Sequence, residues 1–321
     1  MSILINKRFY KVISLFIKAT IFLLSFFYIY HKLISSSYKE AFQYILITNS
    51  IIYYFVLILI LMFINWGLEA RKWQLLIKPY EHISFFKSLK SIFSGVTISI
   101  FTPNRVGEFA GRIFYLKEAN KIQASVKCFI GSASQLLITV MAGIVALVMD
   151  YHKQYNSLPF PNTINYQNIV YALVISILIV ALLLFFLYKK RNVFLINLKS
   201  LIKEALVVEK KILLLVLLLS LLRYGIFTIQ YYLILIFLQV NIDFITAAML
   251  IAIVFFITAA IPTFALTEIV VRGAVAVSVF SLIEVDTFII VSASLLLWII
   301  NLALPALIGS VFVWKLKFFK Q

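Results

Sequence analysis

The chain has 321 residues, of which 64% are hydrophobic, and its formal net charge at pH 7 is +17. Soluble globular proteins contain about 45–50% apolar residues, so the composition excludes a string of soluble domains and predicts an all-α polytopic integral membrane protein. The lysines and arginines lie between apolar runs, which is the positive-inside pattern of membrane topology and argues against a nucleic-acid partner.

Apolar runs of about 20 residues, the length needed to cross a bilayer, recur along the whole chain. We predict about six full crossings, with approximate ranges 12–33, 44–68, 128–149, 169–188, 212–238 and 288–314. The residues that follow the second of these, 69–73, begin a stretch rich in lysine and arginine that we interpret as a basic loop. Trp66 and Trp73 are typical of interface anchors at the end of a span.

The segment 84–116 holds the first of two unusual motifs. An apolar run of about 10 residues, too short to cross, ends at Thr102-Pro103. Thr102 can cap a helix and Pro103 suits its first position, so we expect a new helix to begin here with its free N–H groups directed at an anionic ligand. The sequence therefore predicts a helix break beside a pocket.

Three charged residues follow that break. Arg105 offers a planar fork that matches phosphate or carboxylate. Glu108 and Arg112 are spaced i,i+4 and can pair on one face of the helix. A charge in mid-bilayer costs roughly 2.5–3.5 kcal/mol on insertion scales, so these residues indicate either a binding site or a self-neutralising structural pair.

The segment 244–282 repeats this pattern. Pro262 interrupts it, and Glu268 and Arg272 are again spaced i,i+4 within apolar sequence. Intramembrane charge favours function, while the structural alternative is a buried ion pair that fixes the segment in place. The segment is also long enough for two ordinary crossings, but Pro262 and the charged pair favour a re-entrant hairpin.

Loop charges set the topology. If the cation-rich connections are cytoplasmic, the six crossings place every connection on its expected side only when segments 84–116 and 244–282 each add no net crossing. The prediction is a single transmembrane domain, residues 1–321, with both termini cytoplasmic and two opposed re-entrant or broken hairpins. Opposed broken helices that meet near the midplane are typical of transporters with inverted repeats, and here the repeat is weak and centred on these two segments.

One further arginine lies inside a predicted crossing. Arg223 must find a carboxylate, a carbonyl or water at that depth, and Glu108 and Glu268 are its expected partners. The alternative is an arginine that extends toward the cytoplasmic interface.

Around the first motif the chain resembles a flippase-like membrane family related to the transmembrane half of lysyl-phosphatidylglycerol synthases. That family has a Thr-Pro-Gly-Arg-x-Gly-Glu element, which residues 102–108 match except for Asn104 in place of glycine. It also has a later proline, a glycine-rich stretch and a glutamate. Pro262 and Glu268 fit this element, but residues 264–267 lack the glycines, so the backbone of the second hairpin departs from the pattern.

The resemblance implies a domain that translocates or accommodates a phospholipid or related amphiphile across the cytoplasmic membrane. We expect an anionic or lipid-linked membrane lipid as partner, with no metal, no cofactor and no catalytic residue, because the chain has one cysteine and no nucleotide or metalloprotease motif. Aminoacyl transfer in the relatives belongs to a separate soluble domain, so we do not expect this chain to lysylate lipids. The predicted head-group-binding residues are Arg105, Glu108, Arg112, Arg223, Glu268 and Arg272, and the predicted helix breaks are at Thr102, Pro103 and Pro262.

Other functions remain open from the residues alone. Glu108 or Glu268 could carry a proton in a secondary transporter of a small anion or polar solute. A membrane-embedded transferase that uses a lipid-linked substrate is disfavoured by the missing motifs. A non-catalytic partner of an envelope lipid-modifying enzyme is the last alternative.

Overall fold

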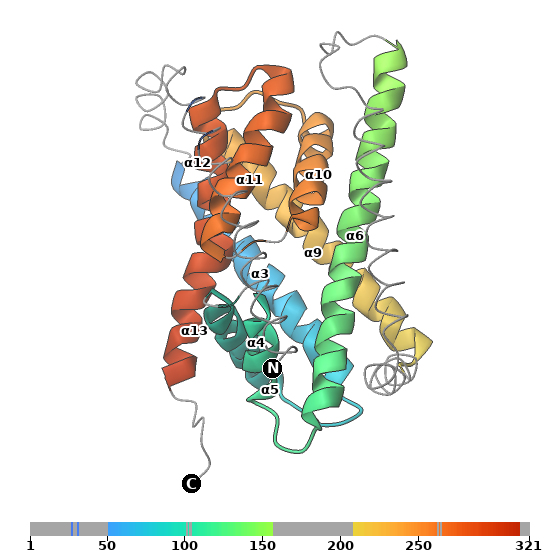
Figure 1. Cartoon of the computed structure of the whole chain (residues 1–321). Coiled ribbons are helices and arrows are strands. Elements are labelled where there is room, and N and C mark those ends of the chain that lie inside the picture. Colours follow the sequence, from blue (N-terminus) through green and yellow to red (C-terminus); the bar gives the residue numbers. More distant parts are fainter. Residues whose placement is uncertain are drawn as a thin grey trace, which may run out of the picture.

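A computed structural model describes residues 51–100, 102, 105–156, 208–261, 263 and 265–314, together with Phe27 and His31. Figure 1 shows that these residues form a bundle of helices, and the described part of the chain contains no strand. The predicted all-helical architecture is confirmed. The elements are α3 (Ile51–Ile77), α4 (Phe85–Ile100), α5 (Gly107–Ile113), α6 (Lys121–Asn156), α9 (Lys210–Phe237), α10 (Phe244–Ala260), α11 (Ala265–Phe280), η2 (Ser281–Ile283), α12 (Thr287–Trp298), the π-helical turn η3 (Ile299–Ala303) and α13 (Leu304–Trp314).

Among the described residues, four helical stretches are long and apolar enough to cross a membrane. They are Ile52–Ile77, Lys121–Met149, Lys210–Phe237 and Thr287–Trp314, with 26 to 29 residues each. They correspond to four of the six predicted crossings, and the other two, 12–33 and 169–188, lie outside the described residues. Large apolar side chains such as Phe63, Leu137, Met141 and Leu214 are exposed on their outer faces, which suits contact with lipid tails.

Helix α3 extends beyond its predicted end. Residues 69–73, interpreted above as a basic loop, are helical, so that prediction is wrong. The reason is that the apolar stripe of α3 continues through Ala70, Trp73 and Ile77, which are fully buried. Packing against the rest of the bundle therefore carries the helix past its charged residues.

The first interrupted segment forms a tightly packed helix pair. A Cβ added at Gly111 of α5 would lie 2.2 Å from the Cα of Gly95 in α4, so the two backbones touch at a point where only glycine fits. Helix α5 begins at Gly107 rather than at Pro103, because the Thr102 hydroxyl accepts a hydrogen bond from the Gly107 N–H at 2.8 Å. The predicted helix start at Thr102-Pro103 is therefore too early, although Thr102 does accept a hydrogen bond from the first residue of α5, and Pro103 itself lies outside the described residues.

The second interrupted segment forms the pair α10 and α11. These helices have 17 and 16 residues, each fewer than the roughly 20 needed for a crossing. Asp243 caps α10 by accepting a hydrogen bond from the Thr246 N–H at 2.8 Å. Pro262, the predicted break, lies outside the described residues. Figure 1 places the α4–α5 pair in one half of the molecule and the α10–α11 pair in the other.

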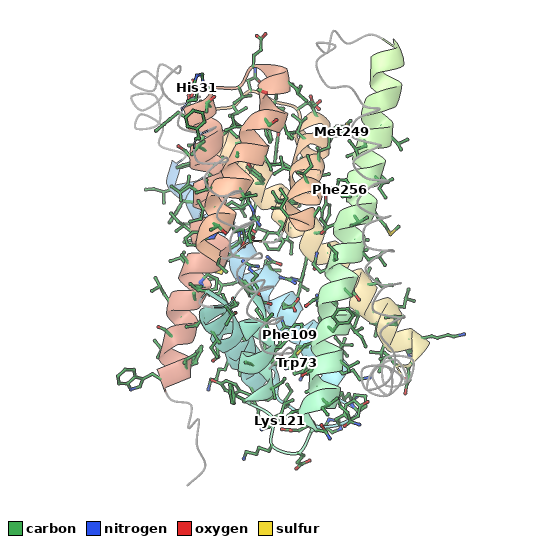
Figure 2. All side chains as sticks on the ribbon, in the orientation of Figure 1. His31, Trp73, Phe109, Lys121, Met249 and Phe256 are labelled. Carbon is green, nitrogen blue, oxygen red and sulfur yellow. The ribbon has the colours of Figure 1, made fainter. Side chains whose placement is uncertain are left out.

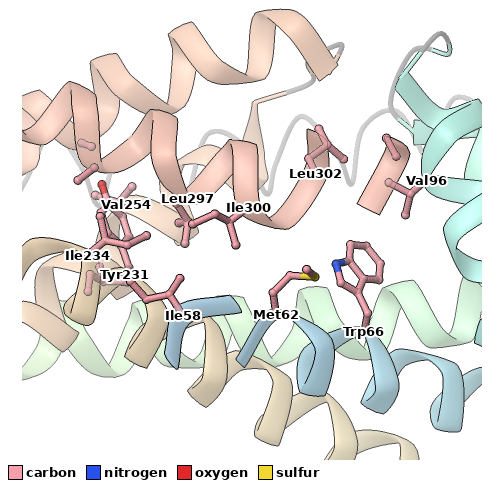
Figure 3. Packing of buried hydrophobic residues seen from close by; sticks show 14 of the residues in the cluster. Ile58, Met62, Trp66, Val96, Tyr231, Ile234, Val254, Leu297, Ile300 and Leu302 are labelled. Atoms are coloured by element: carbon pink, nitrogen blue, oxygen red, sulfur yellow. The ribbon is translucent and has the colours of Figure 1, made fainter. Parts of the chain in front are cut away.

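A core of buried apolar side chains lies between α3, α9, α10 and the last span (Figure 3). Ile58 and Met62 of α3 face Leu297 and Ile300 across this core. Figure 2 shows how side chains pack along the rest of the bundle, for example Phe256 of α10 beside α6. A Cβ at Gly143 of α6 would lie 2.4 Å from the Phe256 Cβ, so α6 and α10 approach closely.

The two ends of the bundle differ in charge. The end that carries the α3–α4 and α5–α6 connections is basic, and the end that carries the α9–α10 and α11–α12 connections holds acidic residues (Figure 1). The basic end has Lys78, Lys87, Lys117 and Lys121 against Glu81 and Glu118, whereas the connections at the other end have the acidic residues Asp243, Glu284 and Asp286. By the positive-inside rule the basic end is expected to face the cytoplasm.

Glu81 ties the two connections together at the basic end. Its Oε2 accepts hydrogen bonds from the backbone N–H groups of Lys117 at 2.7 Å and Glu118 at 2.9 Å, and its Oε1 lies 2.9 Å from the Lys87 Nζ. Burial opposes ionisation of this carboxyl, but the backbone donors and Lys87 outweigh it and lower the pKa of Glu81 to about 2. The carboxylate thus holds the connection before α4 beside the connection that follows α5.

Candidate functional site

Three polar side chains of α3 share one face of the helix. Asn65, Glu69 and Lys72 are spaced i, i+4 and i+7, and all three are buried. The Lys72 Nζ lies 2.7 Å from Glu69 Oε2 and donates a hydrogen bond to the Gly131 carbonyl of α6 at 3.1 Å. These partners allow a lysine to lie in the middle of an apolar bundle.

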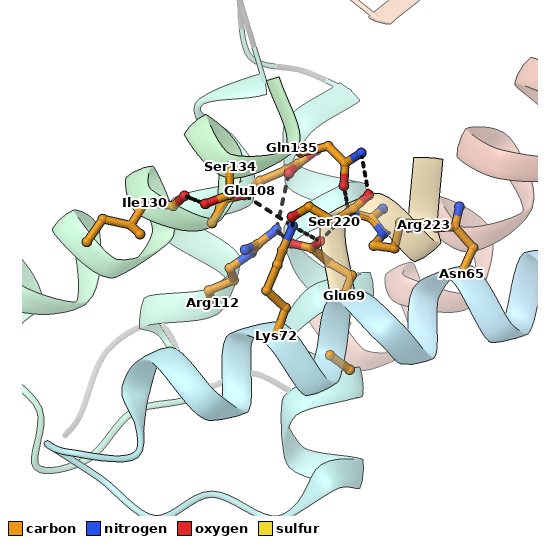
Figure 4. A network of polar contacts seen from close by, with 12 residues as sticks. Asn65, Glu69, Lys72, Glu108, Arg112, Ile130, Ser134, Gln135, Ser220 and Arg223 are labelled. Atoms are coloured by element: carbon orange, nitrogen blue, oxygen red, sulfur yellow. Dashed lines mark hydrogen bonds and ion pairs between the residues drawn. The ribbon is translucent and has the colours of Figure 1, made fainter. Parts of the chain in front are cut away.

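Two arginines from other helices also bind Glu69 (Figure 4). The Nη2 of Arg112, on α5, lies 2.9 Å from Glu69 Oε1. Arg223, on α9, donates from Nη1 to Glu69 Oε2 and from Nε to Asn65 Oδ1 at 2.9 Å. Arg112 and Arg223 are 3% and 7% exposed, so one buried carboxylate joins α3, α5 and α9 through three cations.

Aromatic rings of α3 cover these guanidinium groups. Arg112 lies over Trp73 and Arg223 over Trp66, with 5.9 and 5.7 Å between the guanidinium carbon and the ring centroid. Trp73 is fully buried and Trp66 is 5% exposed. The prediction that these tryptophans anchor the membrane interface is therefore wrong, because their rings stabilise buried cations instead.

The network continues across both helix pairs through Arg105. Arg112 Nη2 lies 3.4 Å from Glu108 Oε2, and Arg105 Nη1 lies 3.8 Å from Glu108 Oε1. Arg105 Nη2 also lies 3.4 Å from Glu268 Oε2, whose other oxygen is 2.6 Å from Arg272 Nη2. Arg105 thus connects the break between α4 and α5 to the start of α11.

Arg105 has an uncommon backbone conformation. Its φ of 56° lies in the left-handed region, which non-glycine residues rarely adopt and which is concentrated at functional sites. Its side chain is 38% exposed, the most open of the charged groups in the network. The break therefore presents a guanidinium group to a hollow in the bundle.

That hollow consists of two adjoining cavities of about 630 and 550 Å³. Arg105, Gln135, Glu268 and Arg272 line both of them. The larger cavity extends beside Tyr224 and the apolar end of α10, and the smaller one extends to the cluster around Glu69. Volumes of this size suit a small ligand or a lipid head group.

Cations outnumber carboxylates around these cavities. The carboxylates are Glu69, Glu108 and Glu268, and the cations are Lys72, Arg105, Arg112, Arg223 and Arg272. At neutral pH the network therefore has an excess of two positive charges. This excess favours an anionic occupant that offers oxygen acceptors.

The six charged residues predicted from the sequence all lie in this network. The prediction that Arg223 binds Glu108 or Glu268 is wrong, because Glu69 of α3 binds its guanidinium group. Glu69, Lys72 and Gln135 were missed. The periodicity of residues 65, 69 and 72 is the signal that could have identified the first two, since it places them on one helix face with Trp66 and Trp73 nearby.

Comparison with protein families decides what kind of protein this is. The family model described as the lysylphosphatidylglycerol synthase TM region matches residues 9–309. The chain belongs to this family. As a member of the lysylphosphatidylglycerol synthase TM-region family it is an integral membrane protein related to phospholipid modification. Comparison with curated proteins and with solved structures gave no significant match.

Proposed function

We propose that this protein is flippase-like and translocates or accommodates an anionic or lipid-linked amphiphile between the leaflets of the cytoplasmic membrane. The observation that carries the proposal is a cavity in a membrane-embedded bundle whose walls hold two more cations than carboxylates. A purely structural network would be expected to balance its charges, because an uncompensated buried charge is costly.

The helix breaks supply a route for the polar head group. In this proposal the α4–α5 and α10–α11 pairs are re-entrant hairpins from opposite faces, in line with their short helices and with the Arg105–Glu268 contact between them. Irregular backbone at membrane depth is tolerated where it lines a polar cavity. Opposed broken helices around a central site are the arrangement that lets a transporter expose the site to either side in turn.

The charged residues have distinct roles. Arg105 and Arg272, at the boundary of both cavities, contact the head group, and Glu268 keeps them in position when the site is empty. Arg112 and Arg223, held by Glu69, form the floor of the smaller cavity. The acyl chains stay in the surrounding lipid, which the exposed apolar faces of α6 and α9 contact.

A lipid-translocation assay tests the proposal. Purified protein is reconstituted into phosphatidylcholine liposomes that carry a trace of acyl-chain-labelled phosphatidylglycerol or cardiolipin, and an impermeant quencher reports the label that reaches the outer leaflet. Wild type is expected to move label faster than empty liposomes, and Arg105→Ala to slow it. Arg71→Ala is the matched control, because Arg71 lies on α3 but is exposed and bonded only to Gln74 among the described residues.

Two outcomes would contradict the proposal. Equal rates in empty liposomes, wild type, Glu108→Gln and Arg272→Ala would show that the network moves no lipid. Uptake of a small anion that depends on a pH gradient, without lipid movement, would instead support a proton-coupled transporter.

A further inference from the structure

We propose that the site takes a lipid whose head group carries two separate phosphate charges, rather than a zwitterionic or aminoacylated lipid. This inference rests on the proposed function, because it concerns the same cavities, and it goes further by naming the class of substrate. Three observations carry it, namely the size of the charge excess, its division between the cavities and the presence of guanidinium groups in both.

The excess of two positive charges is not cancelled elsewhere in the membrane-spanning sequence. The predicted crossings outside the described residues, 12–33 and 169–188, contain no aspartate or glutamate, and the first contains Lys18 and Lys32. The remaining acidic residues all lie in predicted connections or at helix ends. They are Glu40, Glu81, Glu118, Asp150, Glu204, Glu209, Asp243, Glu284 and Asp286. A bound anionic ligand would supply the counter-charge that these residues do not.

The excess is divided evenly between two neighbouring groups of residues. The group at the boundary of both cavities has one carboxylate, Glu268, and two arginines, Arg105 and Arg272. The group that lines the smaller cavity alone has two carboxylates and three cations. These are Glu69, Glu108, Lys72, Arg112 and Arg223. Each group thus has one positive charge in excess, which matches one phosphodiester each.

Guanidinium groups occur in both groups of residues. Arg105 and Arg272 belong to the first, and Arg112 and Arg223 belong to the second. Phosphate oxygens accept hydrogen bonds from guanidinium groups, and the planar fork fits them in pairs. A primary ammonium group can only donate, and it would bring a further positive charge to a network that already has too many. A lysylated head group is therefore disfavoured.

The experiment compares labelled lipids that differ in head-group charge, using the same liposomes and wild-type protein. Cardiolipin carries two separated phosphodiesters, phosphatidylglycerol carries one, lysyl-phosphatidylglycerol is cationic and a polyprenyl diphosphate carries two adjacent phosphates. The interaction free energy of a close charge pair at an interface is at least about 1.5 kcal/mol. One additional phosphate contact of this size corresponds to a factor of about ten, so we expect cardiolipin to be favoured over phosphatidylglycerol about tenfold. Lysyl-phosphatidylglycerol is expected to move no faster than in empty liposomes.

Each outcome separates this inference from the proposed function. If no labelled lipid moves, the proposed function fails. If lipids move but phosphatidylglycerol or lysyl-phosphatidylglycerol equals cardiolipin, the function stands and the inference is overturned. If only the diphosphate moves, the two charges must be adjacent, and the assignment of one phosphate to each group is wrong.

Variants of Arg105 test directly whether the excess positive charge is divided between the two groups of residues. Arg105→Gln removes one excess charge and is expected to abolish the roughly tenfold preference for cardiolipin, while Arg105→Lys keeps the charge and the preference. Arg71→Gln, outside the cavities, is expected to behave as wild type. Monodisperse elution and an unchanged melting temperature check that each variant is folded. A folded Arg105→Gln protein that retains the full preference would overturn the inference.

Discussion

Glu69→Gln is expected to destabilise the protein severely, although it keeps the size of the side chain. The substitution removes the negative charge that Lys72 Nζ contacts at 2.7 Å, that Arg112 Nη2 contacts at 2.9 Å and that Arg223 also binds. The new amide would offer an N–H₂ donor to groups that have only donors themselves. Three buried cations would then lie close together with Glu108 as the nearest remaining carboxylate.

The size of the effect follows from these contacts. Removing one partner of a buried ion pair costs about 3–5 kcal/mol, and because Glu69 has three partners we expect the upper end, about 5 kcal/mol. Total stabilities of folded proteins are about 5–15 kcal/mol, so the loss is a large share. At about 2 °C per kcal/mol, the lower figure for larger domains, the apparent melting temperature should fall by about 10 °C.

Thermal unfolding of the detergent-purified protein, followed by intrinsic fluorescence, measures this change. Glu118→Gln is the matched control, because Glu118 is exposed in the α5–α6 connection and should shift the transition little. Combining Glu69→Gln with Lys72→Met should recover part of the loss, since it removes one of the uncompensated cations. A Glu69→Gln protein as stable as the Glu118→Gln control would refute the view that Glu69 holds the cluster together.

Three further predictions concern other parts of the fold. The pKa of Glu81, about 2 when folded, lies below its ordinary value of 4.5, so its contribution of about 3 kcal/mol is present above pH 4.5 and is lost as the pH falls toward 2. Glu81→Gln should therefore unfold at lower temperature than wild type at pH 7, with a smaller difference near pH 3, and a difference independent of pH would contradict this. Gly111→Ala should cost about 1–3 kcal/mol or more by forcing α5 away from Gly95, whereas Gly225→Ala, with no atom within 4 Å of the new methyl group, should leave the melting temperature unchanged or slightly raised. Cys128 is fully buried, so a maleimide should label it only as fast as the bundle unfolds, and rapid labelling of the native protein would show that the packing around Cys128 opens locally.

Local spacing was sufficient to predict the ion pairs that lie within one helix. Glu108 with Arg112 and Glu268 with Arg272 were expected from their i,i+4 separation, and their closest atoms lie 3.4 and 2.6 Å apart. Such pairs depend only on helical geometry, which a sequence pattern specifies. The two interrupted segments were also predictable, because a proline among charged residues cannot continue an ordinary crossing.

Contacts between helices could not be predicted in the same way. Glu69 is the partner of Arg223 because of the rotation of α9 relative to α3. The packing of side chains throughout the bundle sets that rotation. The charges at residues 69 and 72 also looked like the end of a crossing, because hydropathy alone cannot distinguish a solvated lysine from one bonded to a carboxylate and a carbonyl. Burial of Trp73 on the same helix is what separates the two cases.

Under the proposed function, the lengths of the ion pairs connect binding of the head group with movement of the two helix pairs. The contacts of Glu69 with Lys72 and Arg112, and of Glu268 with Arg272, are 2.6–2.9 Å long, whereas Arg105 reaches Glu268 and Glu108 at 3.4 and 3.8 Å. Arg105 therefore makes the longest contact in the network, its contact with Glu268 equals the 3.4 Å between Arg112 and Glu108, and it joins the two broken helix pairs. A phosphate that binds Arg105 competes with both carboxylates for the same guanidinium group, so occupation of the site would favour separation of the pairs, and their separation would in turn favour occupation.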